Sequence, residues 1–185
     1  MSAQIRSICV YCGARNGTRP EHAAAADAVG RMIARNGWQL VYGAGDVGLM
    51  GAVARAATDR GAAAMGVIPA HLLTLEQGRR DLSRFVVTET MHERKKVMFM
   101  NADAVVVLPG GAGTLDEFFE VLTWRQLGLH AKPVMLLNVA GYWDPLVALI
   151  DHIVAQGFAD DSLRGYVSVV DDATALDRAL RAALS

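Results

Sequence analysis

The sequence has few cysteines, few lysines and no long hydrophobic run. Only two of its 185 residues are cysteine, which excludes a disulfide framework. No apolar stretch reaches the ~18 residues typical of a membrane span. The N-terminal segment also lacks the apolar core and small-residue cleavage site of a signal peptide. These absences predict a cytoplasmic protein that makes no use of a membrane.

Neither sign of charge is in excess. The 18 Lys and Arg residues nearly balance the 19 Asp and Glu residues, for a formal net charge of -1. Nucleic acids and membrane surfaces are bound by strongly basic faces, so we expect neither as a partner. By contrast, 52% of the residues are hydrophobic, enough at this length for one stable core. We therefore expect residues 1–185 to form a single domain.

The two cysteines have the spacing of a redox or metal-binding pair, Cys9-x-x-Cys12. They lie in and directly after a strand-like segment, where positions three apart point to opposite faces. We interpret them as two small buried residues rather than as a redox motif.

Short β-branched runs alternate with longer Ala- and Leu-rich segments. We predict strands over 5–11, 39–42, 63–68, 85–88, 104–108, 133–138 and 166–170, and helices over 22–36, 49–60, 92–101, 115–127, 145–156 and 173–184. This alternation predicts an α/β fold with a doubly wound, Rossmann-like parallel sheet and helices on both faces. In such a sheet ligands bind at the carboxyl ends of the strands, so the loops that follow strands are the candidate site.

The first glycine-rich loop, Gly43-Ala44-Gly45-Asp46-Val47-Gly48, matches the dinucleotide-binding pattern G-x-G-x-x-G. That function also needs an acidic residue ~20 positions further on, to bind the ribose. The next strand ends with residues 66–69, Gly-Val-Ile-Pro, and carries no acid. We favour a tight turn with close helix packing at Gly48 and Gly51 over a dinucleotide site.

The second loop, residues 109–117, reads Pro-Gly-Gly-Ala-Gly-Thr-Leu-Asp-Glu and follows the most apolar predicted strand. Its glycines, Gly110, Gly111 and Gly113, free successive backbone N–H groups at a helix start. This arrangement predicts a phosphate site. Thr114 and Glu117 also have capping-box spacing, in which Glu117 only satisfies a backbone N–H. We favour a Glu117 that faces the crevice beside Glu120, because a bound phosphate would take those donors.

The third segment, residues 90–96, opens a helix with a second capping box, Thr90 and Glu93. Arg94, Lys95 and Lys96 follow, and a solvated basic turn is one interpretation of them. We favour a site role for Arg94, whose guanidinium can fork to a carboxylate or phosphate. The five histidines are interpreted as structural, and no set of residues has metal-ligand spacing. We expect neither a metal nor a cofactor.

The pairing of residues 91–95 with residues 109–117 resembles the LOG family, the cytokinin riboside 5'-monophosphate phosphoribohydrolases formerly described as lysine decarboxylases. The resemblance extends over nearly the whole chain and includes 10–13, 42–51, 66–69, 123–128 and 138–144. The chain departs from the family at Ala44, where glycine is common.

The resemblance implies hydrolysis of the N-glycosidic bond of a purine nucleoside 5'-monophosphate, which yields the free base and ribose 5-phosphate. By the same resemblance, Arg94 and Glu117 match the catalytic pair. The positions that match substrate-binding residues are Gly45, Glu76, Lys95, Gly111, Ala112, Gly113, Thr114 and Thr123. The family is dimeric, with its site near the subunit interface, so we expect a homodimer. We assign the dimer contact to the apolar helix that carries Phe118, Phe119, Leu122 and Trp124.

Two other functions remain open from the sequence, and a third, lysine decarboxylation, is discounted. Lysine decarboxylation would need a lysine in a pyridoxal phosphate motif, and none of the three lysines lies in one. A non-catalytic nucleotide- or cofactor-binding carrier module would share the same fold. A hydrolase of a related nucleotide pyrophosphate or ribosyl phosphate would differ only in its products. The residues do not distinguish adenine from an isoprenylated adenine as the base.

Overall fold

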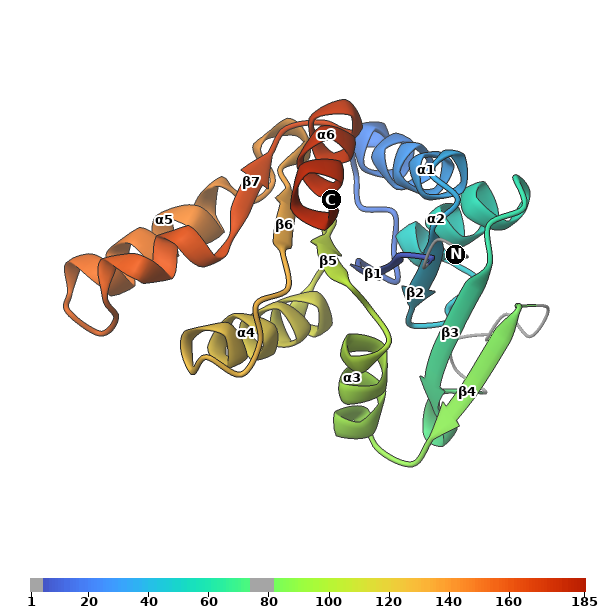
Figure 1. The fold of residues 1–185 in the computed structure, drawn as a ribbon, viewed down its shortest axis with the longest axis horizontal. Helices are drawn as coiled ribbons and strands as arrows, with labels where there is room; N and C mark the ends of the chain where they lie inside the picture. The colour runs from blue at the N-terminus through green and yellow to red at the C-terminus, as the bar shows by residue number, and fades with distance from the viewer. Residues whose placement is uncertain (1–4, 74–81) are drawn as a thin grey trace.

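The computed structural model describes residues 5–73 and 82–185 (Figure 1). Seven parallel strands form one sheet in the order β4-β3-β2-β1-β5-β6-β7. The strands are β1 Ser7–Tyr11, β2 Gln39–Tyr42, β3 Ala64–Pro69, β4 Arg84–Thr88, β5 Ala104–Val107, β6 Val134–Leu137 and β7 Ser168–Val170. The predicted Rossmann-like parallel sheet is confirmed.

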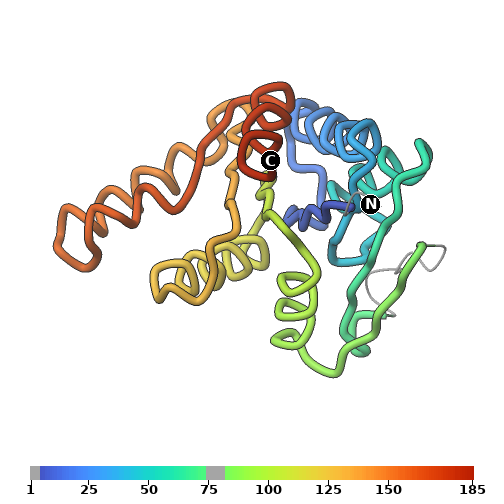
Figure 2. The backbone as a smooth tube through the Cα atoms, viewed as in Figure 1, coloured from blue at the N-terminus to red at the C-terminus, as the bar shows by residue number. Residues whose placement is uncertain are grey.

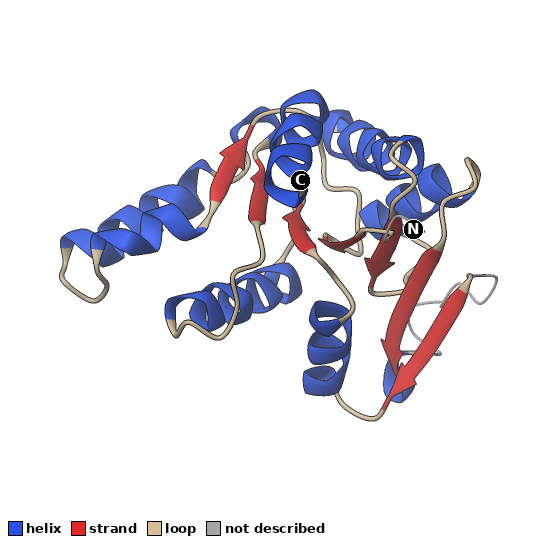
Figure 3. Ribbon diagram, in the orientation of Figure 1, coloured by secondary structure: helices blue, strands red, loops and turns tan. Residues whose placement is uncertain are grey.

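Helices cover both faces of this sheet, as the secondary-structure view shows (Figure 3). Side chains of α1 Pro20–Arg35, α2 Gly48–Thr58 and α6 Ala173–Leu184 share one apolar cluster with one set of strand residues. Side chains of α3 Met91–Met100, α4 Ala112–Gln126 and α5 Asp144–Ala155 share a second cluster with the other set. Strands buried on both sides explain the continuous apolar run of β5, whose residues are fully buried.

The two cysteines lie on opposite faces of the sheet, as the strand geometry predicted. Cys9 belongs to the cluster with α3 and α4, and Cys12 to the cluster with α1 and α2. Both thiols are free and buried, and burial raises the pKa of each. A thiol kept neutral in this way is a poor nucleophile, which agrees with a packing role.

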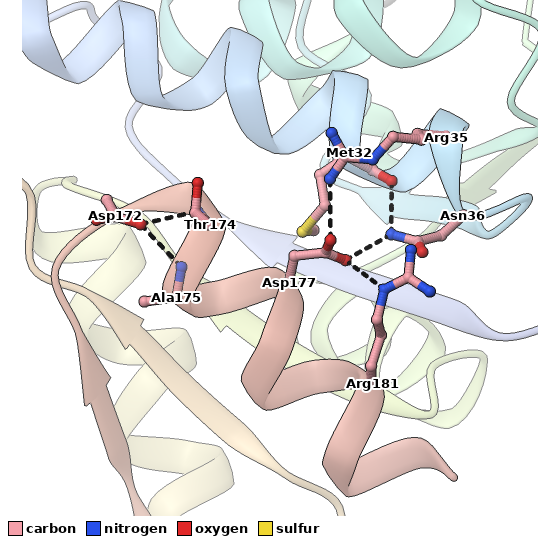
Figure 4. A network of polar contacts seen from close by, with 8 residues as sticks. All are labelled: Met32, Arg35, Asn36, Asp172, Thr174, Ala175, Asp177 and Arg181. Carbon is pink, nitrogen blue, oxygen red and sulfur yellow. Dashed lines mark hydrogen bonds and ion pairs between the residues drawn. The ribbon is translucent and has the colours of Figure 1, made fainter.

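The last helix is attached to the first by a polar network (Figure 4). Asp172 caps α6 by accepting hydrogen bonds from the backbone N–H groups of Thr174 and Ala175, both at 2.8 Å. Asp177 then accepts from Asn36 Nδ2 at 2.8 Å and from the guanidinium of Arg35 at 2.9 Å. These contacts dock α6 onto the carboxyl end of α1.

The strand order reverses at β1, which lies between β2 and β5. The tube view shows that the chain builds one half of the sheet first and crosses back through α3 before it enters β5 (Figure 2). The loops after β1 and β5 therefore leave the sheet in opposite directions and open a crevice between them. In the described ranges, no helix combines the length and the apolar character needed to span a bilayer.

Candidate active site

A cavity of about 590 Å³ opens at this crevice. The loops after β1 and β5 form much of its wall, and residues of α1, α2, α3 and α4, together with Gly43 and Tyr142, complete it. The lining residues used below are Arg15, His22, Gly43, Met50, Met91, Arg94, Met98, Gly110, Gly111, Gly113, Thr114, Glu117 and Tyr142. Its position at the carboxyl ends of the strands, where their order reverses, is the position that parallel α/β sheets favour for ligands.

The glycine loop after β5 presents bare backbone to the cavity. α4 begins at Ala112, and its N-cap residue Gly111 offers no side chain to the N–H groups of the first turn. A Cβ added to Gly111 or Gly113 would meet no atom within 4 Å. A helix start with uncapped donors and open space in front of it is a suitable site for an anion.

Glu117 is not a capping residue, so the capping-box alternative for Thr114 and Glu117 is wrong. The helix begins three residues before the predicted start at Leu115, because Gly111 takes the N-cap position. Thr114 is therefore buried inside the first turn, and Glu117 lies almost one turn further along. The Glu117 side chain is half-buried and lines the cavity together with the glycine loop and Arg94.

Arg94 is held in the cavity wall by two backbone carbonyls. Its Nε donates to Val67 O at 3.0 Å, and its Nη2 donates to Gly43 O at 2.6 Å. Only 5% of the residue is exposed. The start of α3 is fixed by the predicted capping box, in which Thr90 Oγ1 accepts from the Glu93 N–H at 3.2 Å and Glu93 Oε2 accepts from the Thr90 N–H at 3.3 Å. The Arg94 side chain is therefore fixed at its base by the start of α3 and at its guanidinium by the two carbonyls.

The loop 43–48 uses its glycines for close packing, as the sequence favoured. A Cβ on Gly43 would lie 2.2 Å from Arg94 Nη2, and one on Gly48 would lie 2.3 Å from the Ala14 carbonyl carbon. The loop follows β2 rather than β1, so it does not occupy the point of strand reversal. Ala44 has φ 62°, a left-handed conformation that favours glycine.

Cys12 lies in the cavity wall and feels two charges of opposite sign. Burial raises the pKa of its thiol, the Glu117 carboxylate raises it further and the Arg94 guanidinium lowers it. Both members of the predicted catalytic pair thus act electrostatically on one atom of the cavity wall. Across residues 5–73 and 82–185, no group of three or more His, Cys, Asp or Glu side chains could hold a metal ion.

Four predicted substrate-binding residues do not line the cavity, namely Gly45, Lys95, Ala112 and Thr123. Lys95 is buried, and it forms ion pairs with Asp116 and Glu120, each at 2.9 Å. Thr123 is exposed on α4, and its hydroxyl donates to Phe119 O at 2.7 Å. Glu76 lies outside the described residues. The structure thus gathers Arg94, Glu117, Gly111, Gly113 and Thr114 around one cavity and leaves the others apart.

The structure adds residues that the sequence interpretation missed. Arg15, in the loop after β1, lines the cavity, and the point of strand reversal would have indicated that loop. His22, interpreted as structural, also lines it and packs edge-on against Tyr142, with ring centroids 5.3 Å apart. The Tyr142 hydroxyl donates to Gly110 O at 2.6 Å. No local pattern marks His22 or Tyr142, because the contact joins segments 120 positions apart.

The proposed dimer face on α4 is largely inside the subunit. Phe118 is 0% and Leu122 is 3% exposed, because both pack into the cluster with β1 and β5. The prediction of an exposed apolar face is wrong for Phe118 and Leu122, whereas Phe119 and Trp124 are half-buried. Large exposed apolar side chains occur at Met100, the last residue of α3, and at Leu127 and Leu129, which follow the end of α4.

Comparison with known proteins relates the chain to named enzymes. The family model described as "Possible lysine decarboxylase" matches residues 50–180. A protein of Oryza sativa subsp. japonica, named a probable cytokinin riboside 5'-monophosphate phosphoribohydrolase, is 45% identical over 91% of this chain and 74% of its own length. A protein of Rhodococcoides fascians, named a cytokinin riboside 5'-monophosphate phosphoribohydrolase, is 43% identical over 98% of this chain and 94% of its own.

A solved structure shares the fold at lower identity. The molybdenum cofactor binding protein from the phototrophic bacterium Rippkaea orientalis matches 100% of both chains with a TM-score of 0.74 and 19% identity. At that identity the likeness shows the common architecture alone.

Proposed function

The chain belongs to the LOG family, whose model carries the lysine decarboxylase description, and we propose that it is a nucleoside 5'-monophosphate phosphoribohydrolase. It hydrolyses the N-glycosidic bond of a purine nucleoside 5'-monophosphate to the free base and ribose 5-phosphate. The observation that carries this proposal is the cavity in which an uncapped helix start, Glu117 and a fixed Arg94 meet. Each supplies one requirement of the reaction.

The 5'-phosphate is bound at the start of α4. The N-cap residue Gly111 has no side chain that could accept hydrogen bonds from the backbone N–H groups after it, and the positive end of the helix dipole favours an anion there. Arg15 lines the same cavity from the β1 loop, is exposed and makes no hydrogen bond or ion pair with the described residues. It is therefore the cation best placed to neutralise the phosphate. The 5'-phosphate takes no part in the bond cleavage, but binding it positions the C1' of the ribose for reaction.

Glu117 acts at the reacting carbon. Cleavage of the bond between the base nitrogen and the ribose C1' leaves positive charge on the sugar, which a carboxylate stabilises. A carboxylate can also orient a water and accept its proton as the water oxygen bonds to C1', while the base departs with the bonding electrons and is protonated. Arg94 presents a guanidinium whose position its two carbonyl partners determine.

The apolar part of the wall suits a purine. Met50, Met91 and Met98 line the cavity near Arg94, and flexible thioethers adapt to aromatic and aliphatic surfaces of different shape. This lining accommodates adenine or an isoprenylated adenine. A lysine decarboxylase activity finds no support, because none of the three lysines lines the cavity and Schiff-base chemistry needs one there.

A homodimer and a cytoplasmic location remain part of the proposal, as does the absence of nucleic acid as a partner. The exposed side chains of Met100, Leu127 and Leu129 supply apolar surface for a second copy. Sedimentation at micromolar concentration tests this expectation, and a monodisperse monomer would contradict it.

The function is tested by incubating the chain with AMP or isopentenyladenosine 5'-monophosphate and separating the products by chromatography. We expect free base and ribose 5-phosphate in equal amounts. Glu117→Gln should lower base release by at least about a hundredfold while the protein stays folded. Glu89→Gln, at an exposed acid outside the cavity, is the matched control. Nucleotide binding without base release by the unaltered chain would favour the carrier alternative.

A further inference from the structure

Lys95 carries a buried charge that the reaction described above does not use. Its side chain is 5% exposed, and Nζ lies 2.9 Å from Asp116 Oδ2 and 2.9 Å from Glu120 Oε2. Removing an ammonium group from water is costly unless opposite charges and hydrogen bonds compensate for it. Burial lowers the pKa of Lys95, but the hydrogen bonds to the two carboxylates outweigh it, so the net pKa is raised and the charge is kept.

The bridge joins two helices that carry the catalytic pair. Lys95 directly follows Arg94 on α3, and Asp116 directly precedes Glu117 on α4. One helical turn further along, Phe99 of α3 meets Trp124 of α4 edge-on, with ring centroids 5.0 Å apart. The two helices therefore meet at two contacts, Lys95 with Glu120 and Phe99 with Trp124. The second contact lies four residues after the first on each helix. Together with the buried Phe118 and Leu122, which pack α4 against the sheet, they fix how α4 is rotated and how far it is advanced along α3.

The two helices joined by the bridge constrain the proposed catalytic residues differently. Arg94 is held by the carbonyls of Gly43 and Val67, which both lie outside α4. Glu117 lies between Asp116 and Glu120 on α4, and its place depends on where that helix lies. Only the cation of this bridge is fully buried, since Asp116 is 58% and Glu120 22% exposed. Ion pairs that bury a charge add little stability compared with apolar residues of the same size, and their best-attested use is to specify one arrangement.

From this geometry, and resting on the proposed phosphoribohydrolase activity, we propose that Lys95 is a positioning residue. Its bridge to Asp116 and Glu120 sets the register of α4 against α3 and so holds Glu117 at the ribose carbon opposite Arg94. A direct contact with the substrate phosphate is disfavoured. The ammonium is outside the cavity lining and is directed at two carboxylates, which would repel that phosphate.

The test compares Lys95→Met with Lys95→Arg, Glu120→Gln and the control Lys96→Met, whose side chain is on the exposed side of α3. A displacement of about 1 Å at a reacting group lowers turnover by about a hundredfold. We expect Lys95→Met to lower kcat for base release by about ten- to a hundredfold, with the KM for AMP within about twofold. Lys95→Arg should recover most of kcat, Glu120→Gln should lower kcat in the same sense, and Lys96→Met should have no effect.

A substrate-binding Lys95 would give the opposite pattern. Lys95→Met would then raise KM with kcat unchanged, and Glu120→Gln would leave turnover unchanged or improve binding. Either result overturns the proposal. If Lys95→Met fails to fold, Glu120→Gln decides, because it weakens one arm of the bridge and keeps Asp116. Base release by the unaltered chain is measured first, so failure of the activity itself is distinguished from failure of the bridge. Thermal unfolding of Lys95→Met, Glu120→Gln and the double variant tests the bridge independently of turnover. Additive effects of the two substitutions on stability would refute the bridge.

Discussion

Arg94 Nη2 occupies the space that a side chain at Gly43 would need. The nitrogen donates to Gly43 O at 2.6 Å, and a Cβ at Gly43 would lie 2.2 Å from it. The first glycine of a motif that looks like a dinucleotide fingerprint therefore makes room for the guanidinium that we propose to be catalytic. This relationship gives the glycine at position 43 a packing role within the G-x-G-x-x-G sequence.

Gly43→Ala should consequently disable the enzyme through Arg94. The added methyl group must push the guanidinium away from both carbonyls, and we expect base release to fall by about a hundredfold. Steady-state kinetics with AMP measures the loss. Gly165→Ala, at a glycine with open space around it and no left-handed backbone, is the control. Normal turnover in Gly43→Ala would show that the position of Arg94 is not critical.

Two glycines of the loop after β5, Gly110 and Gly113, should have different roles, one in stability and the other in binding of the proposed phosphate. In Gly110→Ala the new Cβ would lie 2.0 Å from Thr114 Oγ1, so the loop must shift and the free energy of unfolding should fall by about 1–3 kcal/mol. In Gly113→Ala the methyl meets no protein atom, and alanine favours the helix by up to about 1 kcal/mol. We expect Gly113→Ala to keep or gain stability but to raise the KM for AMP. Chemical denaturation and kinetics on both variants measure the two effects, and equal losses of stability would contradict this assignment.

Arg15→Ala should weaken binding of the phosphate more than it slows the chemistry. The expected change is a rise of about tenfold in the KM for AMP with kcat little altered, since a hydrogen bond to a charged group contributes about 1.5–3 kcal/mol. Inhibition by inorganic phosphate should weaken in parallel. Arg178→Ala removes an exposed guanidinium on α6, outside the cavity, and serves as the control. An unchanged KM would remove Arg15 from the phosphate site.

Asp177 should make the attachment of α6 sensitive to acid. Burial raises the pKa of its carboxyl, but hydrogen bonds from Asn36, Arg181 and Arg35 outweigh burial, so the pKa is lowered (Figure 4). A depressed folded-state pKa stabilises the protein above the unfolded value of about 3.9, and this stabilisation is lost as pH falls through the folded value. Asp177→Asn should therefore lower the free energy of unfolding at pH 7 by about 1–2 kcal/mol. Its stability should also fall less steeply below about pH 4.

Thermal unfolding across pH measures both changes. Asp59→Asn, which alters an exposed acid at the end of α2, is the control. A steeper acid dependence in Asp177→Asn than in the unaltered chain would contradict the assigned sign of the shift.

Much of the fold could be predicted because local patterns carry it. Each predicted strand is present within two residues at its start and its end, since β-branched runs and Ala-rich helices reflect burial of a continuous face. The boundary of α4 was missed because the glycine at position 111 serves as N-cap without a side chain, where the capping-box pattern favours Thr114. The exposed face assigned to Phe118 and Leu122 was wrong, since helical spacing does not say how much of a face the sheet covers.

The amino-acid sequence by itself determined the parallel α/β architecture, the glycine loop at a helix start, and Arg94 and Glu117 as the candidate pair. Those features depend on spacing along one segment. The direction of Lys95, the carbonyl supports of Arg94 and the contact between His22 and Tyr142 were decided only by the tertiary structure. The physical reason is that a long polar side chain takes whichever partner lies within its reach, and that partner comes from a segment brought near only when the sheet and its helices have packed.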